Sequence, residues 1–170
     1  MDLKKHIRGV PDFPKPGVLF YDITTLLRDF DGLTATIDQL SAPFADKSID
    51  LVIGVESRGF ILGAPVADRL GAGFIPIRKP GKLPAKTVTE SYDLEYGQDA
   101  LEIHADAIEK GQRVLIVDDV LATGGTAAAA VKLVTSLGGS LHALAFLIEL
   151  QFLSGRTKLA GQNIHSVLQY

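Results

Sequence analysis

The sequence contains no cysteine and no tryptophan among its 170 residues, and only one methionine. The absence of cysteine excludes disulfide scaffolds, thiolate zinc sites and cysteine nucleophiles, and leaves no clue to the redox compartment. No apolar run approaches the roughly 20 residues that a membrane span needs. Residues 1–5 are not followed by the apolar stretch of a signal peptide. We therefore expect a cytoplasmic protein that has no membrane partner.

Charge and composition narrow the class of protein further. The net charge is -3, which argues against nucleic acid as a partner. Hydrophobic residues make up 46% and charged residues 22%, as in ordinary globular chains. A chain of 170 residues suits one compact domain, so the sequence predicts a single domain over residues 1–170.

Short apolar runs alternate with helix-like segments along most of the chain. Runs of this length are typical of strands that are buried on both faces of a parallel sheet. Helical patterns lie between them at Gly59–Leu70 and Thr126–Leu137. The sequence therefore predicts an α/β fold, with a mostly parallel sheet flanked by helices. The apolar runs are Leu51–Val55, Phe74–Ile77, Val114–Val117 and Leu144–Ile148.

Two regions depart from this pattern. Residues 78–97 are rich in proline, glycine, lysine and small polar residues, which predicts a long irregular stretch, either a functional lid or a disordered loop. Residues 1–30 carry prolines on both sides of Phe13, followed by Leu19-Phe20-Tyr21. This first region is interpreted either as a packing arm or as a small cap over a site, and composition alone favours the arm.

The segment Val114–Thr126 combines two features that point to one ligand. Asp118 and Asp119 follow an apolar strand, and carboxylates accept hydrogen bonds well from a vicinal diol. Residues 123–126 then place two threonines and two glycines at a helix start, where backbone N–H groups can bind a phosphate. Either half alone is typical of an ordinary strand end or helix start. Together they predict a ribose phosphate site.

Other phosphate and metal motifs are absent. Lys82 follows a glycine but precedes Leu83, so the ending of a P-loop is missing. The histidines have no metal-ligand spacing, and we expect no metal held by the protein alone. Mg²⁺ carried by a pyrophosphate substrate stays compatible with the sequence. The histidines are His6, His104, His142 and His165.

The segment Val114–Thr126 resembles the phosphoribosyl pyrophosphate signature of type I phosphoribosyltransferases. Within that group, Phe13–Ile23 resembles the N-terminal signature of the adenine phosphoribosyltransferases. The segments Ser57–Phe60, Arg78–Pro84 and Tyr92–Gly97 match the same family in order. The resemblance covers almost the whole chain, from about Ile7 to Tyr170.

The resemblance implies the type I phosphoribosyltransferase fold with a small N-terminal hood, residues 1–30, and a flexible catalytic loop, residues 78–97. It implies transfer of a phosphoribosyl group to adenine, giving AMP and pyrophosphate in purine salvage. Mg²⁺ would arrive bound to the pyrophosphate group, and the enzyme would be a homodimer. The family also carries a cis peptide near Glu56–Ser57. No protein nucleophile is needed, because the bond to pyrophosphate breaks through an oxocarbenium-like transition state.

The resemblance also assigns roles residue by residue. Catalysis would rest on Glu95 as general acid/base, together with Asp118, Asp119 and Arg58. Adenine would contact Leu19, Phe20, Tyr21 and Val120. Phosphoribosyl pyrophosphate would contact Arg58, Lys79, Lys82, Tyr96, Asp118, Asp119, Ala122, Thr123, Gly124, Gly125 and Thr126.

Three other hypotheses fit part of the sequence. A phosphoribosyltransferase for xanthine or guanine fits Asp118–Thr126 and fails only on the N-terminal segment. A regulator that senses phosphoribosyl pyrophosphate would carry a DNA-binding domain and a basic face, for which this chain has neither length nor charge. A scaffold with a dead site conflicts with the intact set of Arg58, Lys82, Glu95 and the aspartate pair.

Overall fold

The structure is a computed structural model that describes residues 1–94 and 96–170. The chain divides into two units, Met1–Gln39 and Leu40–Tyr170. Glu95, which the resemblance assigns as general acid/base, lies outside the described residues. No helix in the described part of the chain has the length and apolar character needed to cross a bilayer.

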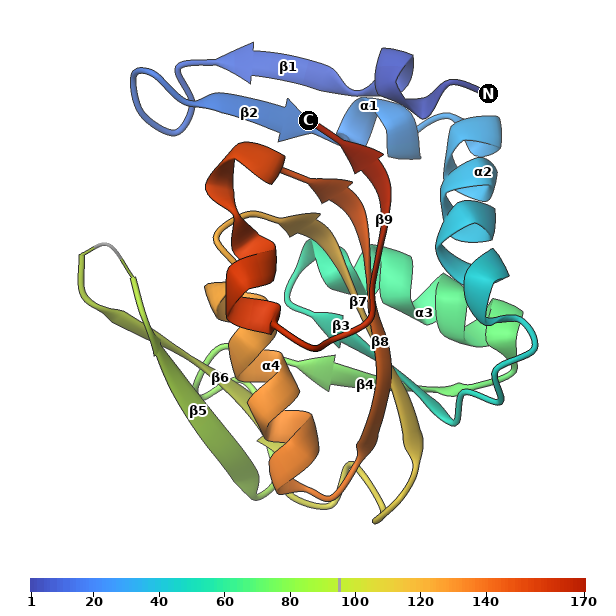
Figure 1. Cartoon of the computed structure of the whole chain (residues 1–170), viewed down its shortest axis with the longest axis vertical. Helices are drawn as coiled ribbons and strands as arrows, with labels where there is room; N and C mark the ends of the chain where they lie inside the picture. Colours follow the sequence, from blue (N-terminus) through green and yellow to red (C-terminus); the bar gives the residue numbers. More distant parts are fainter. Residues whose placement is uncertain (95) are drawn as a thin grey trace. The chain divides into compact units, whose positions relative to one another are not determined.

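The first unit is built on an antiparallel hairpin of β1 (Arg8–Pro11) and β2 (Leu19–Asp22), coloured blue in Figure 1. Phe20 pairs with Val10 across this hairpin. The proline-rich segment between the strands contains a cis Phe13–Pro14 peptide bond. The other elements are a 3₁₀ turn (Leu3–His6), α1 (Thr24–Leu27) and α2 (Phe30–Ser41), which runs past the end of the unit.

Asp22 at the end of β2 makes folding of this hairpin sensitive to acid. The Thr24 hydroxyl donates to its carboxylate at 2.7 Å and Arg8 Nη2 at 2.6 Å. These hydrogen bonds lower the pKa of Asp22 from 3.8 to about 2, and the one from the Thr24 hydroxyl contributes most. Because the folded pKa lies below the unfolded one, this stabilisation is present above pH 3.8 and is lost as the pH falls through about 2.

We therefore expect urea denaturation to show a loss of unfolding free energy as the pH falls below 3.8. Asp22→Asn should flatten that loss, because asparagine has no carboxylate to protonate. Asp68→Asn, at an exposed position of the second unit, is the control. Equal acid sensitivity in wild type and Asp22→Asn would contradict the assignment.

Among the described residues, the central sheet of the second unit has five strands, and every neighbouring pair is parallel. This arrangement confirms the predicted α/β class with a mostly parallel sheet. The predicted apolar runs all lie within strands, whereas the last strand was not predicted. In spatial order the strands are β4 (Gly73–Ile77), β3 (Leu51–Val55), β7 (Arg113–Leu121), β8 (Ser140–Glu149) and β9 (Ile164–Gln169).

The predicted helices are present as α3 (Arg58–Leu70) and α4 (Gly125–Ser136). The connection from β3 to β4 and the connection from β7 to β8 run in opposite directions along the sheet, so right-handed crossovers place α3 and α4 on opposite faces. Accordingly, Val114 and Ile116 pack with α4 in one core cluster, while Leu115 and Val117 are buried outside that cluster.

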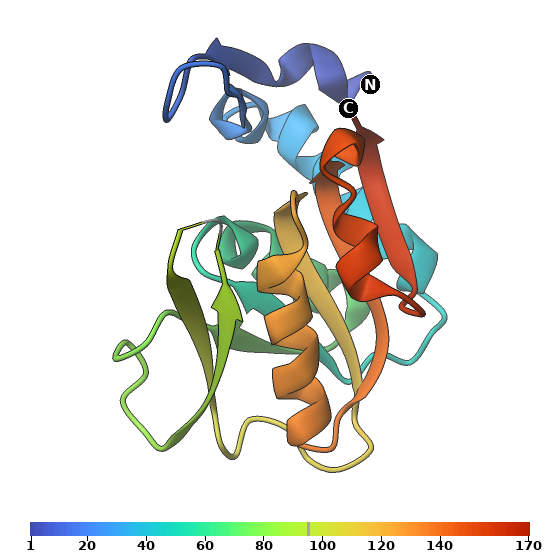
Figure 2. The same cartoon turned by 60° about the vertical axis from the view of Figure 1, so that its left-hand side comes forward.

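A second hairpin, β5 (Thr87–Asp93) and β6 (Gln98–His104), covers the same face as α4 (Figure 1; Figure 2). The prediction of an irregular stretch over residues 78–97 is therefore wrong for residues 87–93. The polar residues there alternate between exposed and half-buried positions, which is the period of a strand. Short 3₁₀ turns complete the unit at Ala42–Phe44, Gln151–Leu153 and Gly155–Leu159.

Candidate active site

The topology of the sheet locates the candidate site at the carboxyl ends of β3 and β7. These strands are neighbours, and the chain leaves them in opposite directions, which defines a topological switch point where ligands bind in open α/β sheets. Pairing of β7 with β3 ends at Val117, whereas pairing with β8 continues to Leu121. Asp118 and Asp119 therefore lie just where β7 loses its neighbour on one side.

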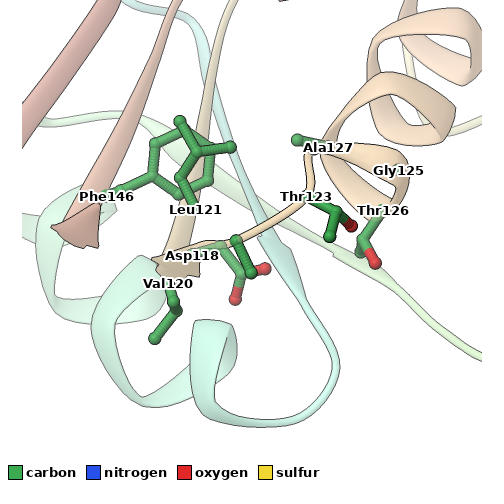
Figure 3. A pocket seen from close by; sticks show the side chains of 10 residues that line it. Asp118, Val120, Leu121, Thr123, Gly125, Thr126, Ala127 and Phe146 are labelled. Atoms are coloured by element: carbon green, nitrogen blue, oxygen red, sulfur yellow. The ribbon is translucent and has the colours of Figure 1, made fainter. Parts of the chain in front are cut away.

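A cavity of about 60 Å³ lies between the end of β7 and the start of α4. Figure 3 shows the Asp118 carboxylate on one side of it and the hydroxyls of Thr123 and Thr126 on the other. A cavity of this size suits a small anion rather than a nucleotide. Its lining also includes Val120, Leu121, Ala122, Gly124, Gly125, Ala127 and Phe146.

The loop around this cavity presents backbone donors. Gly124, at φ +86°, turns the chain into α4. The hydrogen-bond ladder of α4 begins with the Ala128 N–H, which donates to the Gly124 carbonyl at 2.9 Å. The preceding N–H groups of residues 125–127 therefore stand outside the helical ladder, at its positive end. The backbone of Gly155 lies directly behind the same loop. This is the geometry of a phosphate-binding helix start.

A second cavity, of about 210 Å³, adjoins the first and shares Asp118, Val120 and Thr126 with it. Arg58 and Lys79 bring cationic groups to this cavity. The structure thus brings together residues that the sequence analysis assigned to phosphoribosyl pyrophosphate. The remaining lining residues are Val55, Glu56, Ser57, Leu101 and Asp119. The Glu56–Ser57 peptide bond is cis, as the resemblance implied.

The two aspartates differ in their surroundings. The Asp119 carboxylate is buried, with a side chain 8% exposed, and forms an ion pair with Arg58. Asp118 Oδ1 accepts the Asp119 N–H at 2.9 Å. Burial, and then the nearby Asp119 charge, raise the pKa of Asp118 well above its usual range. A carboxyl pair of this kind offers both a charged acceptor and a group poised to exchange a proton.

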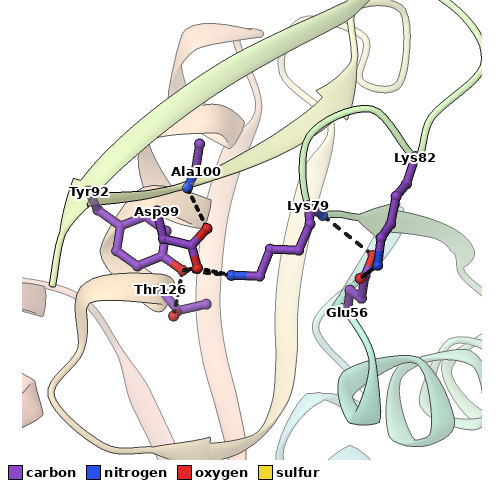
Figure 4. A network of polar contacts seen from close by, with 7 residues as sticks. All are labelled: Glu56, Lys79, Lys82, Tyr92, Asp99, Ala100 and Thr126. Carbon is purple, nitrogen blue, oxygen red and sulfur yellow. Dashed lines mark hydrogen bonds and ion pairs between the residues drawn. The ribbon is translucent and has the colours of Figure 1, made fainter. Parts of the chain in front are cut away.

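Two carboxylates that the sequence analysis did not single out hold the predicted lysines (Figure 4). Lys82 pairs with Glu56, and Lys79 pairs with Asp99. Arg78 Nε also donates to Glu56 at 2.8 Å. Burial alone would raise the pKa of Glu56, but the hydrogen bonds from Lys82 and Arg78 outweigh it and lower the pKa.

The Lys79 pair shifts the titration of both partners. The hydrogen bond from Lys79 lowers the pKa of Asp99. Burial alone would lower the pKa of Lys79, but its hydrogen bonds with Asp99 and Tyr92 prevail and raise it. Both groups are therefore held in their charged forms. Glu56 could have been found from its position directly after β3, whereas Asp99 reaches Lys79 only through the hairpin that the sequence analysis missed.

Several predicted residues lie elsewhere. Lys82 lines neither cavity and is connected to the second one through Glu56. The Tyr96 side chain is 86% exposed. Phe20, in β2 of the first unit, lines a separate cavity of about 220 Å³ with Val10, Phe13 and Asp22. The rings of Phe13 and Phe20 meet edge to face at 5.2 Å, so Phe13 is an aromatic neighbour that the sequence analysis gave no role. Leu19 and Tyr21 flank Phe20 on the same strand.

The chain is similar in sequence and in structure to known phosphoribosyltransferases. The profile of the phosphoribosyl transferase domain matches residues 20–151. An adenine phosphoribosyltransferase of Cyanothece is 62% identical over 170 residues, which is 100% of each chain. The crystal structure of adenine phosphoribosyltransferase from Thermoanaerobacter pseudethanolicus has a TM-score of 0.97 and 53% identity, covering 99% of this chain and 98% of that chain.

A further solved structure carries ligands. The adenine phosphoribosyltransferase of Saccharomyces cerevisiae, complexed with adenine and an imino-altritol bisphosphate, has a TM-score of 0.93 to this chain. It is 42% identical, and the match covers 98% of this chain and 97% of that chain.

Proposed function

The chain belongs to the phosphoribosyltransferase family, and within it to the adenine phosphoribosyltransferases, and from this premise we propose the reaction and the residues that carry it. The chain transfers the phosphoribosyl group of phosphoribosyl pyrophosphate to adenine, releasing pyrophosphate and forming AMP. The observation that supports this proposal best is the pair of adjoining cavities that share Asp118 and Thr126. One has the donors for a phosphate monoester, and the other has the cations for a diphosphate.

The smaller cavity takes the 5′-phosphate of the ribose. The N–H groups at the start of α4, that of Thr126 among them, and the hydroxyl of Thr123 donate to its oxygens. Asp118 and Asp119 accept hydrogen bonds from the two ribose hydroxyls. Because both ends of the sugar are held, its anomeric carbon is fixed between the leaving group and the base.

The larger cavity takes the pyrophosphate group. Arg58 and Lys79 line it, and Lys82 is linked to it through Glu56. These cations offset the negative charge that grows on pyrophosphate as the bond to the sugar breaks. In the described part of the chain, no group of three or more histidines and carboxylates could hold a metal ion. The resemblance assigns Mg²⁺ to the substrate, bound to pyrophosphate oxygens.

The hairpin of the first unit binds the base. Phe20 stacks on the purine, while main-chain groups of Leu19 and Tyr21 contact its edge. These residues are two apart on β2, so their main-chain groups face the same side of the strand. A carbonyl that accepts from the exocyclic amine of adenine rejects a 6-oxo purine, because two acceptors would face each other. The resemblance also assigns Val120 to the base, and Val120 lines both cavities of the second unit.

The remaining roles rest on the resemblance. Glu95 exchanges a proton with an imidazole nitrogen of the purine, and Tyr96 covers the reacting sugar. Residues 78–97 serve as a lid that excludes water, which would otherwise capture the cationic sugar. The homodimer belongs to the same proposal, and size-exclusion chromatography with light scattering tests it.

Phe20→Ala separates base binding from binding of the sugar phosphate. Stacking on an aromatic ring contributes about 1–3 kcal/mol, so KM for adenine should rise by between about 5-fold and about 100-fold. KM for phosphoribosyl pyrophosphate should change much less. Phe30→Ala is the control, since Phe30 is 80% exposed in the same unit. An unchanged KM for adenine would assign Phe20 to packing of the hairpin alone.

The proposed function is tested by mixing the protein with phosphoribosyl pyrophosphate, Mg²⁺ and one purine at a time. AMP from adenine, with no nucleotide from hypoxanthine, guanine or xanthine, is the expected result. A nucleotide from a 6-oxo purine would preserve the phosphate site and overturn the base assignment. No product from any base, with folded protein, would favour a sensor or a dead site.

A further inference from the structure

Lys79 lines the cavity proposed for pyrophosphate and is also paired with a carboxylate of the protein, Asp99. Its side chain is 37% exposed and lines the cavity proposed for pyrophosphate. Its ammonium group is nevertheless paired with Asp99, which comes from β6 and is itself 31% exposed. The Lys79 ammonium already donates to Asp99 and Tyr92, and Asp99 offsets its charge, so a pyrophosphate that binds Lys79 has to compete with Asp99 for it.

The Asp99 carboxylate is held in place from more than one side (Figure 4). Its Oδ1 accepts the Ala100 N–H at 2.8 Å, and its Oδ2 accepts the Tyr92 hydroxyl at 3.2 Å. Tyr92 and Asp99 are register partners across the β5–β6 hairpin. The hairpin therefore presents this carboxylate to Lys79 in a defined orientation and not as a loosely tethered charge.

Tyr92 also connects the pair to the phosphate cavity. Its hydroxyl accepts the Thr126 hydroxyl at 3.3 Å and the Lys79 ammonium at 3.3 Å. A Cβ added at Gly125 would lie 3.3 Å from Tyr92 Cδ2, so the ring lies close to the start of α4. Lys79 Nζ lies 5.8 Å from the centre of the same ring. The lysine, the hairpin and the phosphate loop thus form one hydrogen-bonded unit.

We propose that Asp99 is an internal counter-ion for Lys79, positioned by Tyr92, that competes with the pyrophosphate group for this lysine. Asp99 is a positioning residue, since it acts on the substrate only through Lys79. The pair weakens binding of phosphoribosyl pyrophosphate, and it re-forms as pyrophosphate leaves. This inference rests on the proposed function, because it takes the second cavity as the pyrophosphate site.

Asp99→Asn tests this competition by isothermal titration calorimetry. Asparagine keeps an oxygen for the Ala100 N–H but removes the charge that holds Lys79. Phosphoribosyl pyrophosphate with Mg²⁺ should then bind about five-fold more tightly, because the lysine no longer has to leave an ion pair. AMP, which has no pyrophosphate group, should bind with an unchanged dissociation constant. Asp99→Glu restores the charge and should return the affinity toward wild type.

Two controls separate the counter-ion from a structural role. Glu90 lies on the same hairpin, is 30% exposed and pairs with Lys132 at 3.2 Å, so Glu90→Gln removes a comparable ion pair. That variant should leave both affinities unchanged. Asp99→Asn should also give no tightening when it is combined with Lys79→Met, because the contested cation is gone.

The outcomes are distinct. Unchanged or weaker binding of phosphoribosyl pyrophosphate by folded Asp99→Asn would overturn the proposal. Equal tightening for AMP, or tightening that survives Lys79→Met, would do the same. Failure of the wild-type protein to form AMP from adenine would instead overturn the proposed function, and is measured separately in the purine assay.

Discussion

Replacing Asp118 and Asp119 together by asparagine is expected to lower kcat by about 10⁴-fold. Removing one preorganised contact to a transition state commonly costs about 10²–10³-fold in turnover, and the double variant removes two. Asparagine has nearly the shape of aspartate, so the fold should be kept. The measurement is steady-state formation of AMP at saturating adenine and phosphoribosyl pyrophosphate, with thermal melting as the check on folding.

The reason for so large an effect lies in what surrounds the pair. Asp119 is the ion-pair partner of Arg58, so its loss also frees the cation proposed for pyrophosphate to move. Asp118 borders both cavities and so lies between the positions proposed for the two charged ends of the substrate. The negative charge that the aspartate pair carries stabilises positive charge on the sugar as the bond to pyrophosphate breaks.

A matched control uses aspartates outside the site. Asp68→Asn combined with Asp106→Asn makes the same change of charge at two exposed positions and should retain full activity. If the Asp118 and Asp119 double variant kept kcat within about ten-fold of wild type, the ribose assignment would fail, since such a loss is smaller than one contact typically contributes.

Much of the second unit could be predicted because its signals are local. Buried parallel strands are continuous apolar runs, so Leu51–Val55 was placed to the residue. The glycine-rich helix start, which remains a candidate phosphate loop, was also recognisable because Gly124-Gly125 and its threonines are neighbours in sequence. The Asp118-Asp119 pair was found for the same reason, although β7 continues through it to Leu121.

The contacts that could not be predicted from the sequence are those that the pairing of strands creates. The hairpins are rich in polar residues, and strand β5 alternates only between exposed and half-buried positions, so composition suggested a loop. Asp99 meets Lys79 because β5 and β6 pair in one register, and Glu149 holds Arg156 beneath the phosphate loop at 2.6 Å. Neither pair has a spacing in sequence that predicts it. Register and the packing of separate loops decide both.

The second large effect is expected at two glycines, Gly124 in the candidate phosphate loop and Gly155 directly behind it. A Cβ on Gly155 would lie 2.3 Å from the Ala122 carbonyl oxygen, and a Cβ on Gly124 would lie 2.4 Å from the Gly155 carbonyl oxygen. Both contacts are with backbone atoms, which cannot rotate away as a side chain can. A methyl group at either position must therefore displace the loop that binds the phosphate.

We expect Gly124→Ala and Gly155→Ala each to reduce the unfolding free energy by about 3 kcal/mol, at the upper end of overpacking penalties. Both substitutions should also weaken AMP binding by more than about ten-fold, because the N–H groups at the start of α4 would no longer point toward the phosphate. Urea denaturation measures the first effect, and calorimetric titration with AMP measures the second.

Gly161→Ala distinguishes crowding from backbone strain. Gly161 has φ +81°, close to the +86° of Gly124, but a Cβ there would meet nothing within 4 Å. This variant carries the strain of a left-handed alanine, about 1–2 kcal/mol, without touching the loop. Gly161→Ala should therefore lose some stability and bind AMP normally. Gly155→Ala is the opposite case, because the φ of Gly155 is not positive and the added methyl group causes crowding alone. Normal AMP binding by Gly155→Ala would mean that the turn behind the loop does not position it. Reduced AMP binding in both Gly124→Ala and Gly155→Ala, with normal AMP binding in Gly161→Ala, would assign the loss of binding to crowding between the two loops.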